Sequence, residues 1–235
     1  MPIEQELIIK EVIQRSYNVK SFRLEADSSA LFKAGQFLLV SFKDAPELKR
    51  YLSFSSSPTE KEYIEFTKKI TSSDFSFRLN SLKPLDRLLV KFPMGRFTIE
   101  DNPSKKIAFL SGGIGITPIR SICKYIVDKE LDSDVTLVYA NRTIKDIIFR
   151  EDFEIMQKKY PGLKVHHILC EASPGFTCKI GLINALMIKT EIPDYLERKF
   201  FLCGPPAMVE AMSKMLSEEL LVTKQNIVTE NFQGY

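Results

Sequence analysis

The first hundred residues alternate short apolar runs with turn residues. Six runs of strand length occur here, and the pattern ends at Pro93, Gly95 and Asp101. Regularly spaced runs of this kind are typical of an antiparallel barrel. One interruption, over residues 74–82, places Phe75 and Leu79 at helical spacing and predicts a short helix. The predicted strands are 7–13, 19–24, 36–42, 50–56, 63–70 and 87–92.

After about residue 103 the pattern changes, and strand-like runs alternate with segments of helical periodicity. The strand-like runs are 107–110, 135–140, 164–169, 200–203 and 227–232, and the stretch around Leu182, Leu186 and Met187 is one of the predicted helices. Such alternation implies parallel strands joined by helices on both faces of a sheet. We therefore predict a β plus α/β fold. A six-stranded antiparallel β-barrel over residues 1–102 precedes a five-stranded parallel α/β domain over 103–235.

The stretch LSGGIGITP, residues 110–118, joins a predicted strand to a predicted helix. Gly112, Gly113 and Gly115 allow a sharp turn and a close ligand, and Pro118 suits the first helical turn. The free amides and positive dipole end of a helix start favour a phosphate. The spacing matches neither the G-x-G-x-x-G fingerprint nor the P-loop, so a purely structural turn stays open as an alternative.

Composition describes an ordinary globular protein. Of the 235 residues 44% are hydrophobic and 27% charged, and a net charge of +3 gives no electrostatic case for nucleic acid. The start lacks the pattern of a secretion signal, and no apolar run is long enough for a membrane span, which predicts a cytoplasmic protein.

Cysteine and histidine are sparse. The cysteines form no C-x-x-C pair, which argues against zinc and iron–sulfur sites. The adjacent His166 and His167 point to opposite faces of a predicted strand, which favours an ordinary strand role over catalysis. The four cysteines are Cys123, Cys170, Cys178 and Cys203.

Several motifs in order resemble the ferredoxin–NADP reductase superfamily, which includes NADH–cytochrome b5 reductases and the reductases of oxygenase systems. RYLSFSSSP (50–58) resembles the flavin-binding segment of that family, and GQF (35–37) and P-x-G-x-F (93–97) are usual in its barrel. GGIGITP (112–118) resembles its pyridine-nucleotide loop, and CGPPAM (203–208) its nicotinamide-side loop. YANRTIKDIIFREDFE (139–154) is especially similar to cytochrome b5 reductases. The resemblance covers nearly the whole chain.

The resemblance implies a bound flavin, FAD rather than FMN. Arg50 would pair with a flavin phosphate, and the turn before Ser76 would supply amides to the pyrophosphate. Leu52 stands where relatives carry a tyrosine against the flavin ring. Phe232 or Tyr235 would cover the opposite face, or serve only as terminal packing. The implied flavin-binding residues are Arg50, Tyr51, Leu52, Ser53, Phe54, Ser55, Thr67, Lys69, Ser73, Phe75, Ser76, Phe232 and Tyr235.

The resemblance also implies three catalytic residues. Ser53 aligns with a serine near flavin N5, and Cys203 with a cysteine that packs beside nicotinamide C4. Glu230 resembles a carboxylate in the proton path to N5, although an exposed strand carboxylate is an equal interpretation. The implied nucleotide-binding residues are Gly112, Gly113, Ile114, Gly115, Thr117, Pro118, Asn141, Arg142, Thr143, Cys203, Gly204, Pro205 and Met208.

The implied activity is hydride transfer from NADH or NADPH to FAD, followed by electron transfer to a separate acceptor. The chain itself has no iron–sulfur motif, so the acceptor would be a ferredoxin-like or cytochrome-like protein, a quinone or free flavin. Similarity of residues 139–154 to cytochrome b5 reductases favours NADH, whereas Arg142 and Lys145 would also suit a 2′-phosphate. Two alternatives remain. One is a flavin-holding electron-transfer or regulatory subunit that is inactive without its partner, and the other is a nucleotide-binding module without flavin.

Overall fold

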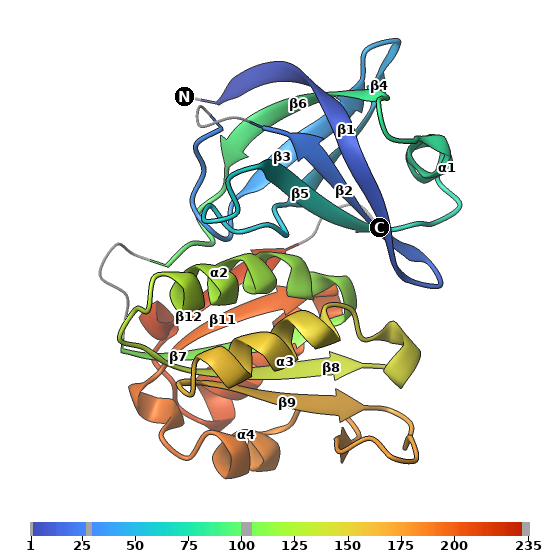
Figure 1. The fold of residues 1–235 in the computed structure, drawn as a ribbon. Coiled ribbons are helices and arrows are strands. Elements are labelled where there is room, and N and C mark those ends of the chain that lie inside the picture. The colour runs from blue at the N-terminus through green and yellow to red at the C-terminus, as the bar shows by residue number, and fades with distance from the viewer. Residues whose placement is uncertain (1, 27–29, 100–104, 232–235) are drawn as a thin grey trace.

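The computed structural model describes residues 2–26, 30–99 and 105–231. Two six-stranded sheets lie one above the other (Figure 1). We call residues 2–99 the N-terminal half and 105–231 the C-terminal half. The predicted domain boundary after residue 102 lies outside the described residues and stays a prediction.

The N-terminal half is an antiparallel sheet that curls into a barrel, as predicted. Its strand order is β4-β3-β6-β1-β2-β5, and a bridge between Phe54 and Phe66 joins the chain just after β4 to the edge strand β5. Inward-facing aromatic rings fill the core, with Phe22 and Phe66 stacked at 5.3 Å. The elements are β1 (Ile3–Ser16), β2 (Val19–Glu25), β3 (Phe37–Phe42), β4 (Ala45–Ser53), β5 (Tyr63–Lys69), α1 (Asp74–Ser81) and β6 (Arg87–Met94).

One barrel strand differs from the prediction over 50–56. β4 ends at Ser53, and the chain leaves the ladder as a loop over residues 54–57. The backbone amides of Ser55 and Ser56 both donate to the carbonyl of Glu65 (2.7 and 3.3 Å). This shared acceptor replaces the alternating bonds of a regular strand, so three consecutive serines turn toward the C-terminal half.

The C-terminal half is a parallel sheet in the order β10-β9-β8-β7-β11-β12. The five predicted strands are present, and the two-residue strand β10 is an addition too short to show a period. Helices α2 and α3 cover the face that meets the barrel, and α4 and α5 cover the other face (Figure 1). The strands are β7 (Lys106–Gly112), β8 (Asp134–Asn141), β9 (Leu163–Leu169), β10 (Lys179–Ile180), β11 (Lys199–Gly204) and β12 (Ile227–Asn231).

The helices of this half begin at recognisable signals. Asn184 caps α4 by accepting from the amide of Met187, so this helix starts after Leu182, which is 73% exposed. The prediction that this helix includes Leu182 is therefore wrong. The helices are α2 (Ile116–Asp128), α3 (Arg150–Lys159), α4 (Ala185–Glu191), α5 (Pro206–Lys214) and the π-helical turn η4 (Met215–Glu219). The 3-10 turns are η1 (Gly113–Gly115), η2 (Ile144–Asp146), η3 (Tyr195–Glu197) and η5 (Lys224–Asn226).

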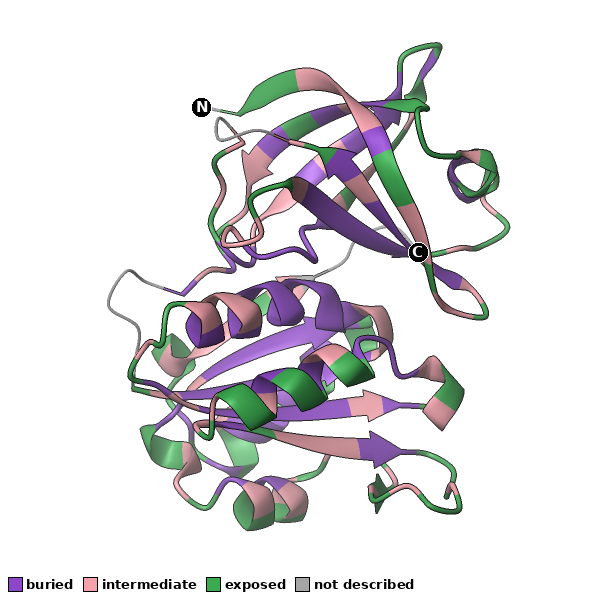
Figure 2. Cartoon of the chain, viewed as in Figure 1, coloured by how far each residue is buried: buried purple, intermediate pink, exposed green. Residues whose placement is uncertain are grey.

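Burial follows the layers, with the sheets and the inner sides of α2 and α3 enclosed (Figure 2). His166 and His167 point to opposite faces, as predicted. His166 Nδ1 lies 2.8 Å from Glu191, and the His167 ring lies between the rings of Tyr139 and Phe176. No helix within the described ranges is long and apolar enough to cross a membrane.

Candidate flavin and nucleotide sites

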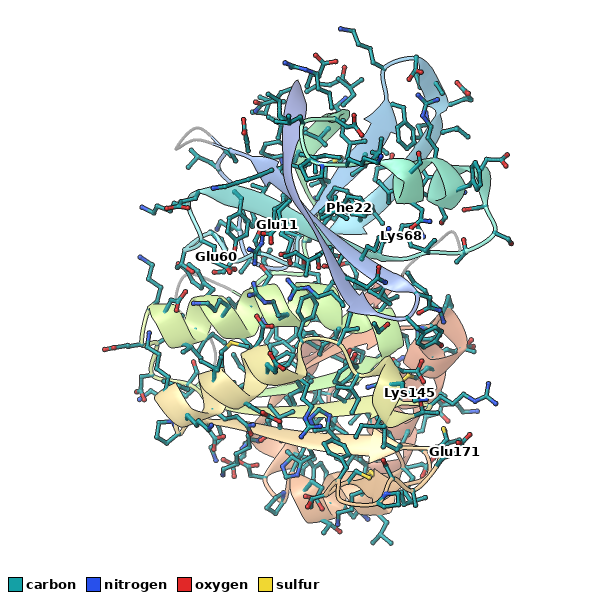
Figure 3. The ribbon with its side chains drawn as sticks, turned by 45° about the vertical axis from the view of Figure 1, so that its right-hand side comes forward. Glu11, Phe22, Glu60, Lys68, Lys145 and Glu171 are labelled. Atoms are coloured by element: carbon teal, nitrogen blue, oxygen red, sulfur yellow. The ribbon has the colours of Figure 1, made fainter. Side chains whose placement is uncertain are left out.

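Two cations lie close together on the N-terminal half. Arg50 ends its side chain 5.6 Å from the ring of Phe75, at the start of α1. Lys68 is only 7% exposed, and its Nζ donates to the carbonyl of Lys69 (3.0 Å). Burial, and then the charge of Arg50, lower the pKa of Lys68 to about 8. Figure 3 shows Lys68 beneath α1.

These cations form a candidate site for an anion. Within the described part of the chain no carboxylate pairs with Arg50 or Lys68, so a buried positive charge lacks a counter-ion. A lysine with a depressed pKa regains its full charge when an anion binds beside it. The pair therefore fits a ligand with phosphate groups, such as the diphosphate of FAD.

The start of α1 adds hydroxyl groups to this site. Ser73 is the N-cap, and its Oγ accepts from the amide of Ser76 (3.3 Å). The Oγ atoms of Ser73 and Ser76 lie 3.1 Å apart, and Thr71 Oγ1 lies 3.0 Å from Ser76. The turn without glycine thus keeps a regular helix start, with Ser76 buried beneath it.

Burial increases along the segment from Tyr51 to Ser55. Tyr51 is 60% exposed and meets the ring of Phe37 edge-on, whereas Leu52 and Ser53 are more enclosed. Phe54 lies in the barrel core, stacked on Phe32 at 4.0 Å. Thus only part of this segment remains open to a ligand.

Three further predicted flavin residues are placed differently from Arg50. Ser55 Oγ donates to the buried Glu65 (2.7 Å), and Thr67 Oγ1 lies 2.8 Å from Ser55 Oγ. Lys69 is exposed on the opposite face of β5 from Lys68. The structure therefore does not gather Ser55, Thr67 and Lys69 with Arg50. Phe232 and Tyr235 lie outside the described residues.

Polar side chains line one row of the C-terminal sheet. Pairing places Glu230 opposite Cys203, Cys203 opposite Ser111, Ser111 opposite Tyr139, and Tyr139 opposite His167. Paired residues on parallel strands point to the same face, so the row runs along the carboxyl ends of five strands. Ligands of parallel α/β sheets lie at this edge.

The glycine turn packs directly against this row. A Cβ on Gly115 would lie 2.4 Å from the carbonyl oxygen of Cys203, so only glycine allows the close approach. Gly113 has a φ of +52°, and a Cβ there would meet nothing within 4 Å. Tyr139 Oη donates to the carbonyl of Gly113 (3.0 Å) and holds the turn. The turn thus presents the start of α2 beside open space, where a phosphate fits.

The other predicted nucleotide residues surround this turn. Thr117 Oγ1 donates to the carbonyl of Ile114 (3.2 Å) at the start of α2. Pro205 precedes α5, and Met208 lies so close to Gly112 that a Cβ there would collide with its sulfur. Pro118 is buried in the first turn of α2, and Gly204 follows Cys203 on β11.

The end of β8 forms the far part of the site. Asn141 is buried, and Thr143 Oγ1 donates to Asp146 (2.8 Å) in a capping box. Arg142 is exposed, with its Nε 3.8 Å from a carboxylate oxygen of Glu171. Glu171 and Lys145 project at this edge (Figure 3). Arg142 and Glu171 therefore form a charged pair just beyond the end of β8.

Comparison with known proteins assigns both halves. Residues 4–99 match the family described as an oxidoreductase FAD-binding domain, and residues 109–214 match the oxidoreductase NAD-binding domain. The chain belongs to the ferredoxin–NADP reductase superfamily. Its cofactor site is thus one for FAD, and its second site is one for a pyridine dinucleotide.

Individual relatives fall in the same superfamily. The chain is 34% identical over 216 residues to the glycine betaine monooxygenase reductase subunit of Pseudomonas aeruginosa, covering 88% of this chain and 58% of that one. It is 34% identical over 165 residues to NADH-cytochrome b5 reductase 1 of Mortierella alpina, covering 69% and 55%. The solved ferredoxin reductase in carbazole 1,9a-dioxygenase superposes with a TM-score of 0.87 at 26% identity, covering 99% and 70%. The chain spans less than two thirds of the length of these curated relatives.

Within this reductase fold, the Cys203 and Glu230 pair has unusual acidities. Burial raises the pKa of Glu230 to about 7. Burial, and then the neighbouring Glu230, raise the pKa of the Cys203 thiol well above its usual range. Near neutral pH the thiol is therefore uncharged, and Glu230 exchanges its proton.

Sequence reasoning missed Lys68 and Tyr139. Lys68 follows Ile64 and Phe66 at a spacing of two, so strand alternation places it on the inner face and signals an unusual buried lysine. Tyr139 looks like an ordinary core aromatic in the sequence. Only its hydrogen bond to Gly113 reveals that it supports the turn.

Proposed function

We propose that this chain transfers a hydride from NADH to bound FAD and passes the electrons to a separate acceptor. One observation carries the proposal: the two candidate sites are tied together. Arg120 and Ser121 of α2 donate to the carbonyls of Ser55 and Ser56, at 2.9 and 2.6 Å. The loop after Ser53 and the helix after the glycine turn are thereby joined at one interface.

The residues at the two candidate sites have different chemical roles. Arg50 and Lys68 neutralise and orient phosphate groups, and the turn from Gly113 to Gly115 offers helix-start amides to a second diphosphate. FAD, when bound, supplies a ring that accepts a hydride and releases electrons.

The row at the end of the sheet serves the nicotinamide. The uncharged thiol of Cys203 provides an apolar contact and does not act as a nucleophile. Glu230 Oε holds a proton close to neutral pH, as a general acid must. Ser53 provides a hydroxyl at the end of β4.

The choice of NADH is supported by the charge at the end of β8. Glu171 lies beside Arg142 and offers an acceptor to a ribose hydroxyl, whereas its charge repels a 2′-phosphate. A relative of similar sequence is named as an NADH-dependent cytochrome reductase.

The proposed acceptor is a redox protein on a separate chain, because the relatives are named as reductases of an oxygenase and of a cytochrome. A quinone or free flavin is the alternative electron acceptor among small molecules. Acceptor surfaces consist of scattered side chains, so the acceptor is identified by assay.

The test is an anaerobic visible spectrum of the purified chain, followed by separate titration with NADH and NADPH. We expect yellow protein that NADH bleaches at lower concentration than NADPH. Ferricyanide reduction by NADH then reports turnover. Yellow protein that neither nucleotide bleaches would instead indicate a subunit that needs its partner. Colourless protein that FAD cannot reconstitute would contradict the flavoenzyme.

A further inference from the structure

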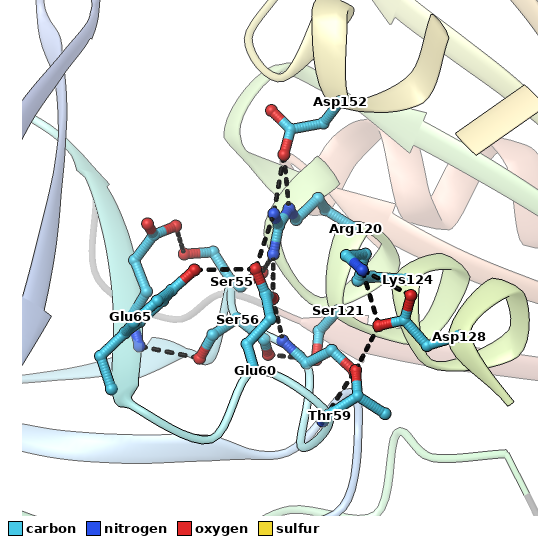
Figure 4. A network of polar contacts seen from close by, with 12 residues as sticks. Ser55, Ser56, Thr59, Glu60, Glu65, Arg120, Ser121, Lys124, Asp128 and Asp152 are labelled. Carbon is cyan, nitrogen blue, oxygen red and sulfur yellow. Dashed lines mark hydrogen bonds and ion pairs between the residues drawn. The ribbon is translucent and has the colours of Figure 1, made fainter. Parts of the chain in front are cut away.

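Arg120 is an enclosed cation at the junction of the two halves. It lies on α2, and its side chain is 4% exposed. Its Nη1 donates to the carbonyl of Ser55 (2.9 Å) and to Glu60 (2.5 Å), and its Nη2 donates to Glu60 (3.2 Å) and Asp152 (2.7 Å). Nε donates to Asp152 as well (3.2 Å). Figure 4 shows Arg120 between these partners from both halves.

Ser121, the next residue of α2, makes a second hydrogen bond to the same loop. Ser121 Oγ donates to the carbonyl of Ser56 (2.6 Å), so consecutive residues of α2 bind consecutive carbonyls of the loop. Further along, Thr59 Oγ1 donates to Asp128 (2.5 Å) at the end of the same helix. The loop from Ser55 to Thr59 is therefore bonded along the length of α2.

The loop is also fixed from the barrel side. Ser55 Oγ donates to Glu65, which is 1% exposed and accepts from Arg15 (3.0 Å) and Arg23 (2.9 Å). The guanidinium carbons of Arg15 and Arg120 lie 4.8 and 5.5 Å from the ring centre of Phe149. One connected network thus runs from β5 and β1 to α2 and α3.

The charge of Arg120 is permanent. Burial alone would lower its pKa, but Glu60 and Asp152 raise the pKa instead. Likewise burial would raise the pKa of Glu60, and the Arg120 charge keeps it below its usual range. Arg120 therefore stays charged, and its charge favours the ionised form of Glu60.

We propose that Arg120 is a positioning residue for hydride transfer, which sets how the flavin-side loop meets the nucleotide-side helix. Ser55 is two residues from Ser53, and Arg120 is five residues from Gly115, so the bond between them joins the two sites by a short, rigid path. Hydride transfer is sensitive to sub-ångström changes in the separation of donor and acceptor. This inference rests on the proposed function.

The experiment compares Arg120→Met with Arg198→Met in the full chain loaded with FAD. Arg198 is a matched control: its side chain is also 4% exposed, and it binds Asp134, Asp194 and the carbonyl of Ile107. All its partners lie in the C-terminal half, at the end of the sheet away from Cys203. Both variants lose a buried, ion-paired guanidinium, but only one loses the junction.

The readout is the limiting rate of flavin reduction by NADH in anaerobic stopped flow, together with NADH affinity and the isotope effect of NADH deuterated at the transferred position. We expect Arg120→Met to retain FAD and to bind NADH within about threefold, with reduction slowed roughly 10- to 100-fold and a changed isotope effect. Arg198→Met should lose stability and keep its rate. Arg120→Lys and Glu60→Gln, which retains the side-chain volume, should each have a rate of flavin reduction between those of Arg120→Met and Arg198→Met. These two variants replace Arg120→Met in the comparison if Arg120→Met does not fold.

Equal rate losses in the Arg120 and Arg198 variants, or a wild-type rate in every Arg120 and Glu60 variant, would overturn the positioning role. If neither NADH nor NADPH reduces the FAD of the wild-type protein, the proposed function is contradicted, and so is this inference. If NADH reduces the FAD of the wild-type protein and that of Arg120→Met equally fast, only the inference is contradicted.

Discussion

Cys203 and Glu230 lie opposite each other on the parallel strands β11 and β12, with their side chains on the same face of the sheet. Burial opposes ionisation of both groups, and the charge of Glu230 makes ionisation of the Cys203 thiol still less favourable. The pair therefore carries one exchangeable proton near neutral pH, on Glu230.

Glu230 should give flavin reduction a pH transition near 7, and Glu230→Gln should remove it. Stability should follow the same proton. The folded pKa of about 7 exceeds the usual value of 4.5, so the folded state binds the proton more tightly and loses stability as pH rises from about 4.5 to 7. Urea unfolding at pH 5 and pH 8 should show a smaller fall in Glu230→Gln than in wild type. The two proteins share His166 and His167, so their difference isolates Glu230, and an unchanged fall would contradict the assignment.

Cys203→Ala should slow flavin reduction by about tenfold, because the thiol fixes the nicotinamide and a smaller side chain leaves it loose. FAD should stay bound. Cys123→Ala is the control, since Cys123 is also a buried thiol but lies on α2 within the core. Both variants should lose about 1–2 kcal/mol of stability to the missing sulfur, and stopped flow should separate them. Equal reduction rates would remove Cys203 from the site.

Lys68→Met should weaken FAD binding about tenfold or more, whereas Lys69→Met should leave it nearly unchanged, because Lys68 is enclosed beside Arg50 and Lys69 is exposed. FAD binding should also weaken as pH rises through about 8, where the free lysine loses its charge. This loss should disappear in Lys68→Met. Fluorescence titration of the apoprotein at pH 7 and 9.5 measures both effects. A stronger effect of Lys69→Met would transfer the role to Lys69.

Gly115→Ala should abolish NADH binding and destabilise the chain, because its Cβ would collide with the backbone of Cys203 and Gly204 and push α2 away from β11. Gly175→Ala is the control. Its φ of +76° makes a side chain costly by roughly 1–2 kcal/mol, but a Cβ there would meet nothing within 4 Å. Thermal unfolding and NADH titration should separate the two, and wild-type affinity in Gly115→Ala would show that the turn can shift freely.

The sequence patterns that predicted the fold were those with a clear local period. The barrel strands, apart from the end of the run over 50–56, and the five longer strands of the C-terminal half were predicted from apolar runs and are confirmed. The serine loop after β4 looks like strand in the sequence, and only the shared carbonyl of Glu65 bends it away. Strand β10 has two residues, which is too few to show any period.

The candidate site was predictable where one segment supplies the chemistry, as in the glycine turn and in CGPPAM. It was not predictable where distant segments meet. Arg120 and Ser55 are 65 residues apart, and neither residue has a neighbour that signals the bond. Lys68 and Lys69 are chemically identical, and only strand alternation, which places Lys68 on the inner face with Ile64 and Phe66, distinguishes them in the sequence.

Arg142 and Glu171 should decide between the two nucleotides. Arg142→Ala should change the Michaelis constant for NADH by less than about threefold, because the exposed guanidinium faces Glu171 and contributes little as a surface pair. Glu171→Gln should lower the Michaelis constant for NADPH, because it removes the charge that repels a 2′-phosphate and frees Arg142 to bind one. Steady-state assays with both nucleotides and ferricyanide test each change. If wild type uses NADPH well and Arg142→Ala loses only that activity, Arg142 already binds the 2′-phosphate and the preference for NADH is wrong.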